Sequence, residues 1–252
     1  MRRERRAATA ALAAIVLLAG DTLAQPRASP ADDLLARPVA LVVALALVTL
    51  LPFAFMAVTA FVKISTVLQI VRGAIGAQNV PSNTVVTALA ASLTILAMAP
   101  VGTRVADRAG PLLAPGAAPD TTALVAGTVE AVREPLRDFL RANASPREHE
   151  RFYELARGAR PEAERGLVGR DDLTVVIPAF VVTELLEAFA LGFAIYLPFL
   201  VLDLVVANVL LALGMQMMNP TQVSLPFKLL LFVAVDGWGL LAQALVSGYR
   251  VA

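Results

Sequence analysis

Charged side chains stand in parts of this sequence that are otherwise apolar. Four acids and two lysines occupy such positions: Lys63, Glu184, Glu187, Asp203, Lys228 and Asp236. An unpaired charge in hydrocarbon is costly, so intramembrane charges usually pair with one another or face a wet cavity. Two lysines cannot pair with all four acids within one chain. The remaining acids need water or another subunit as a partner, which favours an oligomer. A second interpretation is that several of them mark the membrane boundary and snorkel, and it suits the two lysines at least as well.

The stretch Leu213–Trp238 combines apolar residues with polar and sulfur-bearing ones. Three methionines precede an Asn-Pro pair, and five polar or charged residues follow one another at short intervals: Met215, Met217 and Met218, with Gln216, Asn219, Gln222, Lys228 and Asp236. Non-helical backbone at membrane depth survives only where protein covers it or water wets it. We therefore interpret this stretch as the inner wall of an assembly. A short extramembrane loop with methionine as apolar filler explains the residues equally well.

Catalytic patterns are missing from the chain. The only histidine, His149, lies in a charged segment and is expected to be a solvated helix residue, so a His-based triad or a His-rich zinc site at membrane depth is excluded. No glycine-rich loop ends in Lys-Ser/Thr, and Asp203 and Asp236 lack the surroundings of an aspartyl protease dyad. With no cysteine, thiolate chemistry is excluded too. We predict a protein that is not an enzyme and holds no metal or cofactor.

The composition indicates a membrane protein. Of 252 residues, 58% are hydrophobic, and the mean hydropathy is +0.73, which is too apolar for an ordinary soluble domain. A net charge of +1 without a basic stripe argues against nucleic acid as a partner.

The N-terminus resembles an export signal. Four arginines precede the apolar run Ala7–Gly20, and small residues follow near Ala24. We predict a signal peptide over residues 1–24 and a periplasmic leader over 25–38. An uncleaved anchor or a misplaced start codon are the alternatives.

Residues 39–106 are expected to form an N-terminal helical hairpin. Val39–Val62 is long enough for one pass and Thr84–Val101 for a second that ends at Pro100. The intervening loop, 63–83, carries Lys63 and Arg72 and no acid, so the positive-inside rule places it in the cytoplasm. Ser82 or Asn83 is suited to cap the second helix.

Residues 107–172 have a different composition and predict a small helical periplasmic domain; a solvated linker is the alternative. Thr121–Ala142 has apolar residues on roughly one helical face. Ser145, followed by Pro146 and Glu148, forms a capping box that should open a helix stopping near Gly158.

Residues 173–252 are expected to form C-terminal helical hairpins around a Met-rich pore loop at 214–226. Leu173–Leu197 and Phe199–Leu213 are separate apolar runs hinged at Pro198, and Leu225–Val246 is a further run. Ala188 and Gly192 have the small-xxx-small spacing that permits close helix approach. The fold class is thus an all-α membrane protein: apolar helical hairpins with proline breaks plus the small periplasmic domain.

Several motifs in order resemble one family. They are the runs 59–65 (TAFVKIS), 71–76 (VRGAIG), 78–83 (QNVPSN), 177–185 (IPAFVVTEL), 197–204 (LPFLVLDL), 224–228 (SLPFK) and 235–238 (VDGW), with Met98-Ala99-Pro100 and the methionine cluster. This pattern, spanning about Leu50 to Leu241, is similar to the R subunit of the type III secretion export apparatus, the SctR/YscR/HrcR group, which is related to flagellar FliP. Phe61–Ser65 and the Val-Pro-Ser-Asn turn favour the injectisome branch, whereas the signal and the length look more flagellar.

The resemblance implies a pore-forming export-gate subunit for unfolded secreted proteins. Five copies would join the S and T subunits in the bacterial inner membrane, at the secretion basal body, beside the export gate and switch subunits of the same machine. Met215, Met217 and Met218 would then form a gasket, a flexible seal around the substrate, in which Gln216 departs from a pure methionine run. Much of the apolar surface would lie above the bilayer plane against other subunits. The alternatives are a flagellar gate subunit, an assembly scaffold without a pore, and an ion-coupled carrier using Glu184, Glu187 and Asp203, although the inverted repeats of a carrier are not visible.

Overall fold

The computed structural model describes residues 52–77, 80–113 and 121–250, and the positions 42, 45, 46 and 48–50. The predicted signal peptide and leader lie outside these residues. By internal contacts the chain divides into Met1–Phe55 and Met56–Ala252. In the first unit the described residues are helical. The helix ends at Val58, so the first predicted pass stops short of Val62.

Helix α3, Phe61–Ile75, lies at the centre of the second unit. Ile64, Val67, Leu68 and Val71 repeat at helical spacing and are fully buried. The helix ends where Gly76 adopts a left-handed conformation, with φ of 76°, and donates its N–H to the carbonyl of Arg72. The predicted loop over 63–83 is therefore wrong in extent, because most of it is this helix. The basic residues had indicated only which side of the membrane this segment faces, and its apolar spacing is that of a helix.

Helix α4, Asn83–Ala109, follows after a short connection. Ser82 caps it by accepting a hydrogen bond from the Val85 N–H, as predicted. The helix passes through Pro100, where the sequence had indicated its end. A proline removes one backbone hydrogen bond, but Ala97 and Val101 are buried on either side of it, and this packing keeps the helix continuous.

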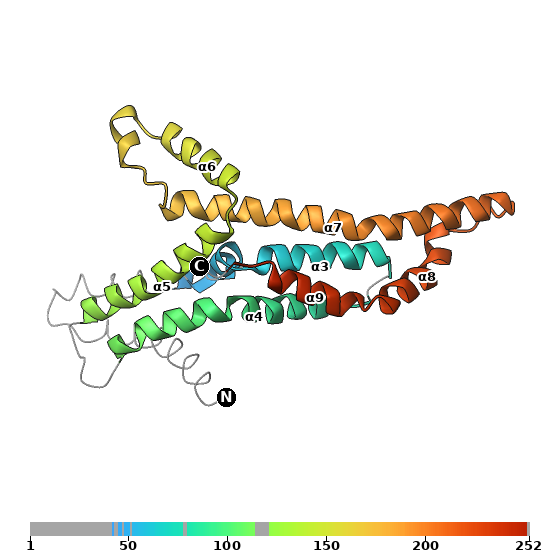
Figure 1. The fold of residues 1–252 in the computed structure, drawn as a ribbon, viewed down its shortest axis with the longest axis horizontal. Coiled ribbons are helices and arrows are strands. Elements are labelled where there is room, and N and C mark those ends of the chain that lie inside the picture. Colours follow the sequence, from blue (N-terminus) through green and yellow to red (C-terminus); the bar gives the residue numbers. More distant parts are fainter. Residues whose placement is uncertain are drawn as a thin grey trace. The chain divides into compact units, whose positions relative to one another are not determined.

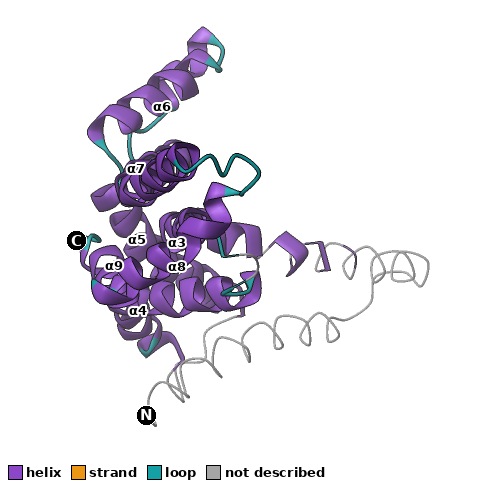
Figure 2. Ribbon diagram, turned by 90° about the vertical axis from the view of Figure 1, so that its right-hand side faces the viewer, coloured by secondary structure: helices purple, strands orange, loops and turns teal. Residues whose placement is uncertain are grey.

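Helix α7, Leu173–Ala212, is 40 residues long and contains Pro178 and Pro198. The predicted division at Pro198 is wrong: the two apolar runs form one helix. In Figures 1 and 2, α7 lies between α3 on one side and α6 on the other, and it contacts both. It thus carries residues from the centre of the fold to its surface.

The described part of the segment between α4 and α7 is mostly helical, as predicted. It contains η2 (Pro111–Leu113), α5 (Thr121–Asn143), α6 (Pro146–Gly158) and η3 (Glu162–Leu167). The capping box is confirmed, since Ser145 Oγ accepts from the Glu148 N–H and Pro146 opens α6. Helix α5 packs on α4 and α7, and its Phe139 and Leu140 belong to the common core.

Helices α8 (Pro220–Ala234) and α9 (Gly237–Ser247) are bent by 58° relative to each other. Pro226, one of the proline breaks expected in these hairpins, lies inside α8 and does not interrupt it, so that expectation is wrong. The bend falls at Asp236, which has φ of 52°, and at Gly237, where a β-carbon would come within 2.3 Å of the Phe232 ring. Because α8 begins at Pro220, the Met-rich connection is 213–219, shorter than the predicted 214–226.

Apolar length identifies the candidate membrane spans. Helices α4 and α7 are each long and apolar enough to cross a bilayer, and the number rises to four if each bent helix pair of the described residues counts as one span. No strand occurs among the described residues. The prediction of an all-α membrane protein is confirmed.

Candidate functional site: buried ion pairs and an exposed methionine turn

Lys63 of α3 pairs with two glutamates of α7. Its Nζ lies 3.2 Å from Glu184 Oε1 and 2.8 Å from Glu187 Oε2. Lys63 and Glu184 are buried, whereas the Glu187 side chain is 53% exposed. Glu184 and Glu187 are three apart on one helix, so both reach the same neighbour on α3. This arrangement sets one positive charge against two negative ones across the central helix contact.

Tyr249, after the end of α9, closes this cluster. Its hydroxyl contacts Glu184 Oε2 and lies 3.1 Å from the Ala60 carbonyl oxygen. Lys63 Nζ stands 4.2 Å from the centre of its ring. Burial raises the pKa of the Tyr249 phenol, and the nearby Glu184 carboxylate raises it further. Tyr249 therefore keeps its proton and remains a hydrogen-bond donor.

Helix α5 holds the C-terminal segment in place. Asn143 makes a two-way bond with the backbone of Arg250: its Nδ2 donates to the carbonyl at 3.0 Å and its Oδ1 accepts from the N–H at 2.9 Å. Phe139 stacks on Tyr249 with 5.8 Å between ring centres. The sequence analysis missed this cluster of the C-terminal segment. A usable signal was the charge imbalance, because two acids facing one lysine need a further hydrogen-bond donor.

A second cluster surrounds Lys228 of α8. Its Nζ lies 2.6 Å from Asp203 Oδ2 on α7 and donates to the Ala74 carbonyl of α3 at 3.2 Å. Ser224 donates its hydroxyl to the other oxygen of Asp203. Lys228 is 2% exposed. It thus joins three helices beside the C-terminal end of α3, where the helix dipole favours a cation.

The two clusters are far apart on α7. Glu184 and Asp203 are separated by nineteen residues of one continuous helix, which corresponds to about 28 Å along its axis. The structure thus joins Glu184 with Glu187 and places Asp203 elsewhere. A relay running directly through all three would need further groups between them.

Asp236 is placed differently from the other predicted charges. It is exposed, lies at the bend between α8 and α9, and makes no ion pair with the part of the chain that the structure describes. It was predicted to take part in an intersubunit or buried charge pair, and it occupies the turn itself. A pairing between subunits stays a prediction.

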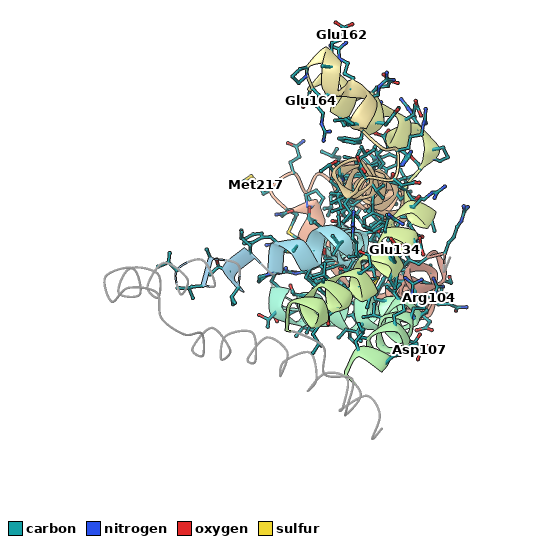
Figure 3. All side chains as sticks on the ribbon, turned by 90° about the vertical axis from the view of Figure 1, so that its left-hand side faces the viewer. Arg104, Asp107, Glu134, Glu162, Glu164 and Met217 are labelled. Atoms are coloured by element: carbon teal, nitrogen blue, oxygen red, sulfur yellow. The ribbon has the colours of Figure 1, made fainter. Side chains whose placement is uncertain are left out.

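The predicted gasket residues lie in the turn between α7 and α8, which we call the methionine turn (213–219). Its backbone is fixed: the Met215 N–H donates to the Leu210 carbonyl at 2.9 Å, and Gly214 adopts φ of 76°. Its methionine side chains are exposed to different degrees. Met217 is fully exposed, and Met215 and Met218 are exposed by 42% and 45%. Figure 3 shows Met217 pointing away from the helices.

A cavity of about 560 Å³ adjoins the methionine turn. It lies between the connection from α3 to α4 and the start of α8, and its lining residues are Gly76, Ala77, Val80, Asn219, Thr221, Gln222, Leu225 and Leu229. Two of the polar residues of the C-terminal stretch therefore face this cavity. Asn219 also caps α8 by accepting from the Thr221 N–H.

His149 differs from its predicted state. Its Nε2 is buried and has no hydrogen-bond partner among the described residues, so the side chain is not fully solvated. The reason is that α6 packs on α7. The described residues contain no group of three or more His, Cys, Asp or Glu that is arranged to hold a metal.

Fold and site together define an all-α membrane protein whose long helix α7 carries the acids of two ion-pair clusters and ends in an exposed methionine turn. The chain belongs to the FliP family, whose model matches residues 44–245. That match encloses the region, about 50 to 241, on which the resemblance rested.

Three relatives match most of the chain. Pathogenicity-related ORF2 of Xanthomonas campestris pv. glycines is 44% identical over 83% of this chain and 96% of its own length. Hypersensitivity response secretion protein HrcR of Ralstonia nicotianae is 42% identical over the same shares. Yop proteins translocation protein R of Yersinia pestis is 40% identical over 83% of this chain and 95% of its own length. The resemblance to the type III secretion R subunit is confirmed.

Proposed function

We propose that this chain is a pore-forming subunit of a type III secretion export gate, in its injectisome branch, and that it conducts unfolded proteins. The observation that carries this proposal is the nearly full-length similarity to relatives named for the hypersensitivity response, Yop translocation and virulence. Those names describe secretion components, which also supports a role without catalysis.

The surface of the single chain supports an assembly. Large apolar side chains of α7 and α8 are exposed, among them Phe189, Phe193, Phe227, Leu230 and Val233. Together they form far more apolar surface than a soluble monomer leaves open. We propose that five copies, the S and T subunits, and lipid cover this surface in the bacterial inner membrane, at the basal body. The helical segment 107–172 would face the periplasm, and export gate and switch subunits would be neighbours in the same machine.

The methionine turn suits a gasket. Its backbone is held by hydrogen bonds, and its side chains are unbranched thioethers without intrachain packing at Met217. Such side chains repack against one another and around varied partners. Copies of the turn gathered around an axis would close a pore when empty and fit loosely around a passing chain.

The test is a leak measurement on the assembled complex. Replacing Met215, Met217 and Met218 with alanine should make vesicles containing the complex permeable to small solutes. Leu167→Ala provides the control, because this residue is also exposed but lies in η3. If the triple variant keeps its native mass and its vesicles remain impermeable to small solutes, the methionine turn does not act as a gasket. A stable monomer on co-expression with the S and T subunits would remove the gate itself.

A further inference from the structure

The hydroxyl of Tyr249 faces two acceptors with a single hydrogen. Glu184 Oε2 and the Ala60 carbonyl oxygen both lie within hydrogen-bond distance of it. A phenol donates only one hydrogen bond but also accepts. If Tyr249 donates to Glu184, its contact with Ala60 is unused. If it donates to Ala60, its oxygen is free to accept a hydrogen bond from a protonated Glu184.

The charges around Tyr249 do not balance either. One cation, Lys63, forms ion pairs with two carboxylates, those of Glu184 and Glu187. The groups that act on Glu184 are Lys63 from α3, Glu187 from its own helix and Tyr249 from the C-terminal segment. The α5 residues that contact the C-terminal segment, Phe139 and Asn143, are uncharged. With both carboxylates ionised, a buried cluster carries one excess negative charge, which burial disfavours.

One added proton satisfies every group without moving a heavy atom. With a proton on Glu184 Oε2, this oxygen donates to Tyr249, and Tyr249 donates to the Ala60 carbonyl. That carbonyl already accepts from the Ile64 N–H and has a second lone pair for the phenol. Lys63 then forms a balanced pair with Glu187, at the shorter of its two distances.

We propose that Glu184 is a proton-binding site, in which Tyr249 reverses the direction of its hydrogen bond when the proton arrives. The proton comes from water and enters by way of Glu187, the half-exposed member of the cluster. Without the proton, the phenol bonds the C-terminal segment to α7 alone; with it, the phenol accepts from Glu184 of α7 and also donates to Ala60, the residue before α3. This inference does not rest on the export function.

Infrared difference spectroscopy tests the site on the purified full-length chain. Between about pH 8 and about pH 6, above the range in which exposed carboxylates titrate, the wild type should gain one carboxylic-acid C=O band per chain. Glu184→Gln should lack that band, because the amide keeps the shape but cannot take up the proton. Glu164→Gln, an exposed change in η3, should leave it intact.

Two further variants separate the site from a structural effect. Tyr249→Phe removes only the hydroxyl, so the acid band should remain but move in frequency as its acceptor is lost. Glu187→Gln leaves Lys63 to Glu184 alone, so the band should be weaker than in the wild type at the same pH. A wild-type spectrum without an acid band in this range overturns the proposal, and so does a band that Tyr249→Phe does not move. The second outcome decides the question even if Glu184→Gln fails to fold.

Discussion

Ile70 of α3 and Gly192 of α7 lie in direct contact. A β-carbon at position 192 would come within 2.5 Å of Ile70 Cδ1 and 3.2 Å of its Cβ. The small residue therefore sets how closely the two helices approach, and this approach brings Lys63 within reach of the glutamates of α7.

Gly192→Ala should destabilise the fold by about 1–3 kcal/mol, because the added methyl overpacks the contact between α3 and α7. Gly73→Ala on α3 is the matched control, since a β-carbon there meets nothing within 4 Å. That change should stabilise the helix by about 0.5–1 kcal/mol. Denaturant unfolding in detergent measures both, and equal effects of the two changes would contradict the close contact.

Lys63→Met should cost about 3–5 kcal/mol of folding stability, because it leaves the carboxylate of Glu184 buried without its cation. Glu187→Gln should cost no more than about 1 kcal/mol of folding stability, because the Glu187 side chain is half exposed and solvent screens its pair with Lys63. Thermal unfolding of the two variants checks the difference. A larger loss for Glu187→Gln would mean that the outer pair dominates the cluster.

Replacing Asp203 should destabilise the fold more than replacing its partner Lys228. Asp203→Asn leaves the buried ammonium of Lys228 without its carboxylate partner and should cost about 3–5 kcal/mol of folding stability. Lys228→Met leaves a partly exposed carboxylate that Ser224 still bonds, so its cost should be nearer to about 1–2 kcal/mol. A double replacement less damaging than Asp203→Asn alone would support the pairing. Unfolding measurements on the three variants supply the comparison.

Alkaline stability should depend on Tyr249. Because burial and then Glu184 raise its pKa in the folded chain, the unfolded chain loses this proton first, at its ordinary value of about 10. The stability from this group is present below about pH 10 and falls as the pH rises above it. Wild type should therefore lose more unfolding free energy than Tyr249→Phe between about pH 8 and about pH 11. Tyr153 and Tyr196 are common to both chains, and a parallel loss would contradict the shift.

The sequence predicted which charges needed partners but not how they pair. Lys63, Glu184 and Lys228 stand out because apolar residues surround them. The choice of partners depends on the α3 and α7 contact, which local pattern does not encode. Tyr249 follows the last apolar run without periodicity, so only the tertiary fold reveals its role.

The helix boundaries show where tertiary packing overrides the helix-breaking tendency of proline. Pro100, Pro198 and Pro226 each predict a break, and each lies inside a helix. Buried apolar side chains lie beside Pro100 and Pro198, whereas beside Pro226 the buried residues are Ser224 and Lys228, which bond Asp203 of α7. In each case tertiary contacts outweigh one lost backbone hydrogen bond. The break near the C-terminus falls instead at Asp236-Gly237. That dipeptide is itself a turn signal, and it was available in the sequence.

The 40 residues of α7 have a consequence for its surroundings. A rod of that length extends for about 60 Å, twice the roughly 30 Å of a bilayer's hydrocarbon layer. Large apolar side chains are exposed from Leu186 to Leu211, over most of the rod. In an upright helix this exposed stretch is about 38 Å long, which is more than the acyl chains can shield. The remainder of this helix is then left for neighbouring polypeptide to cover.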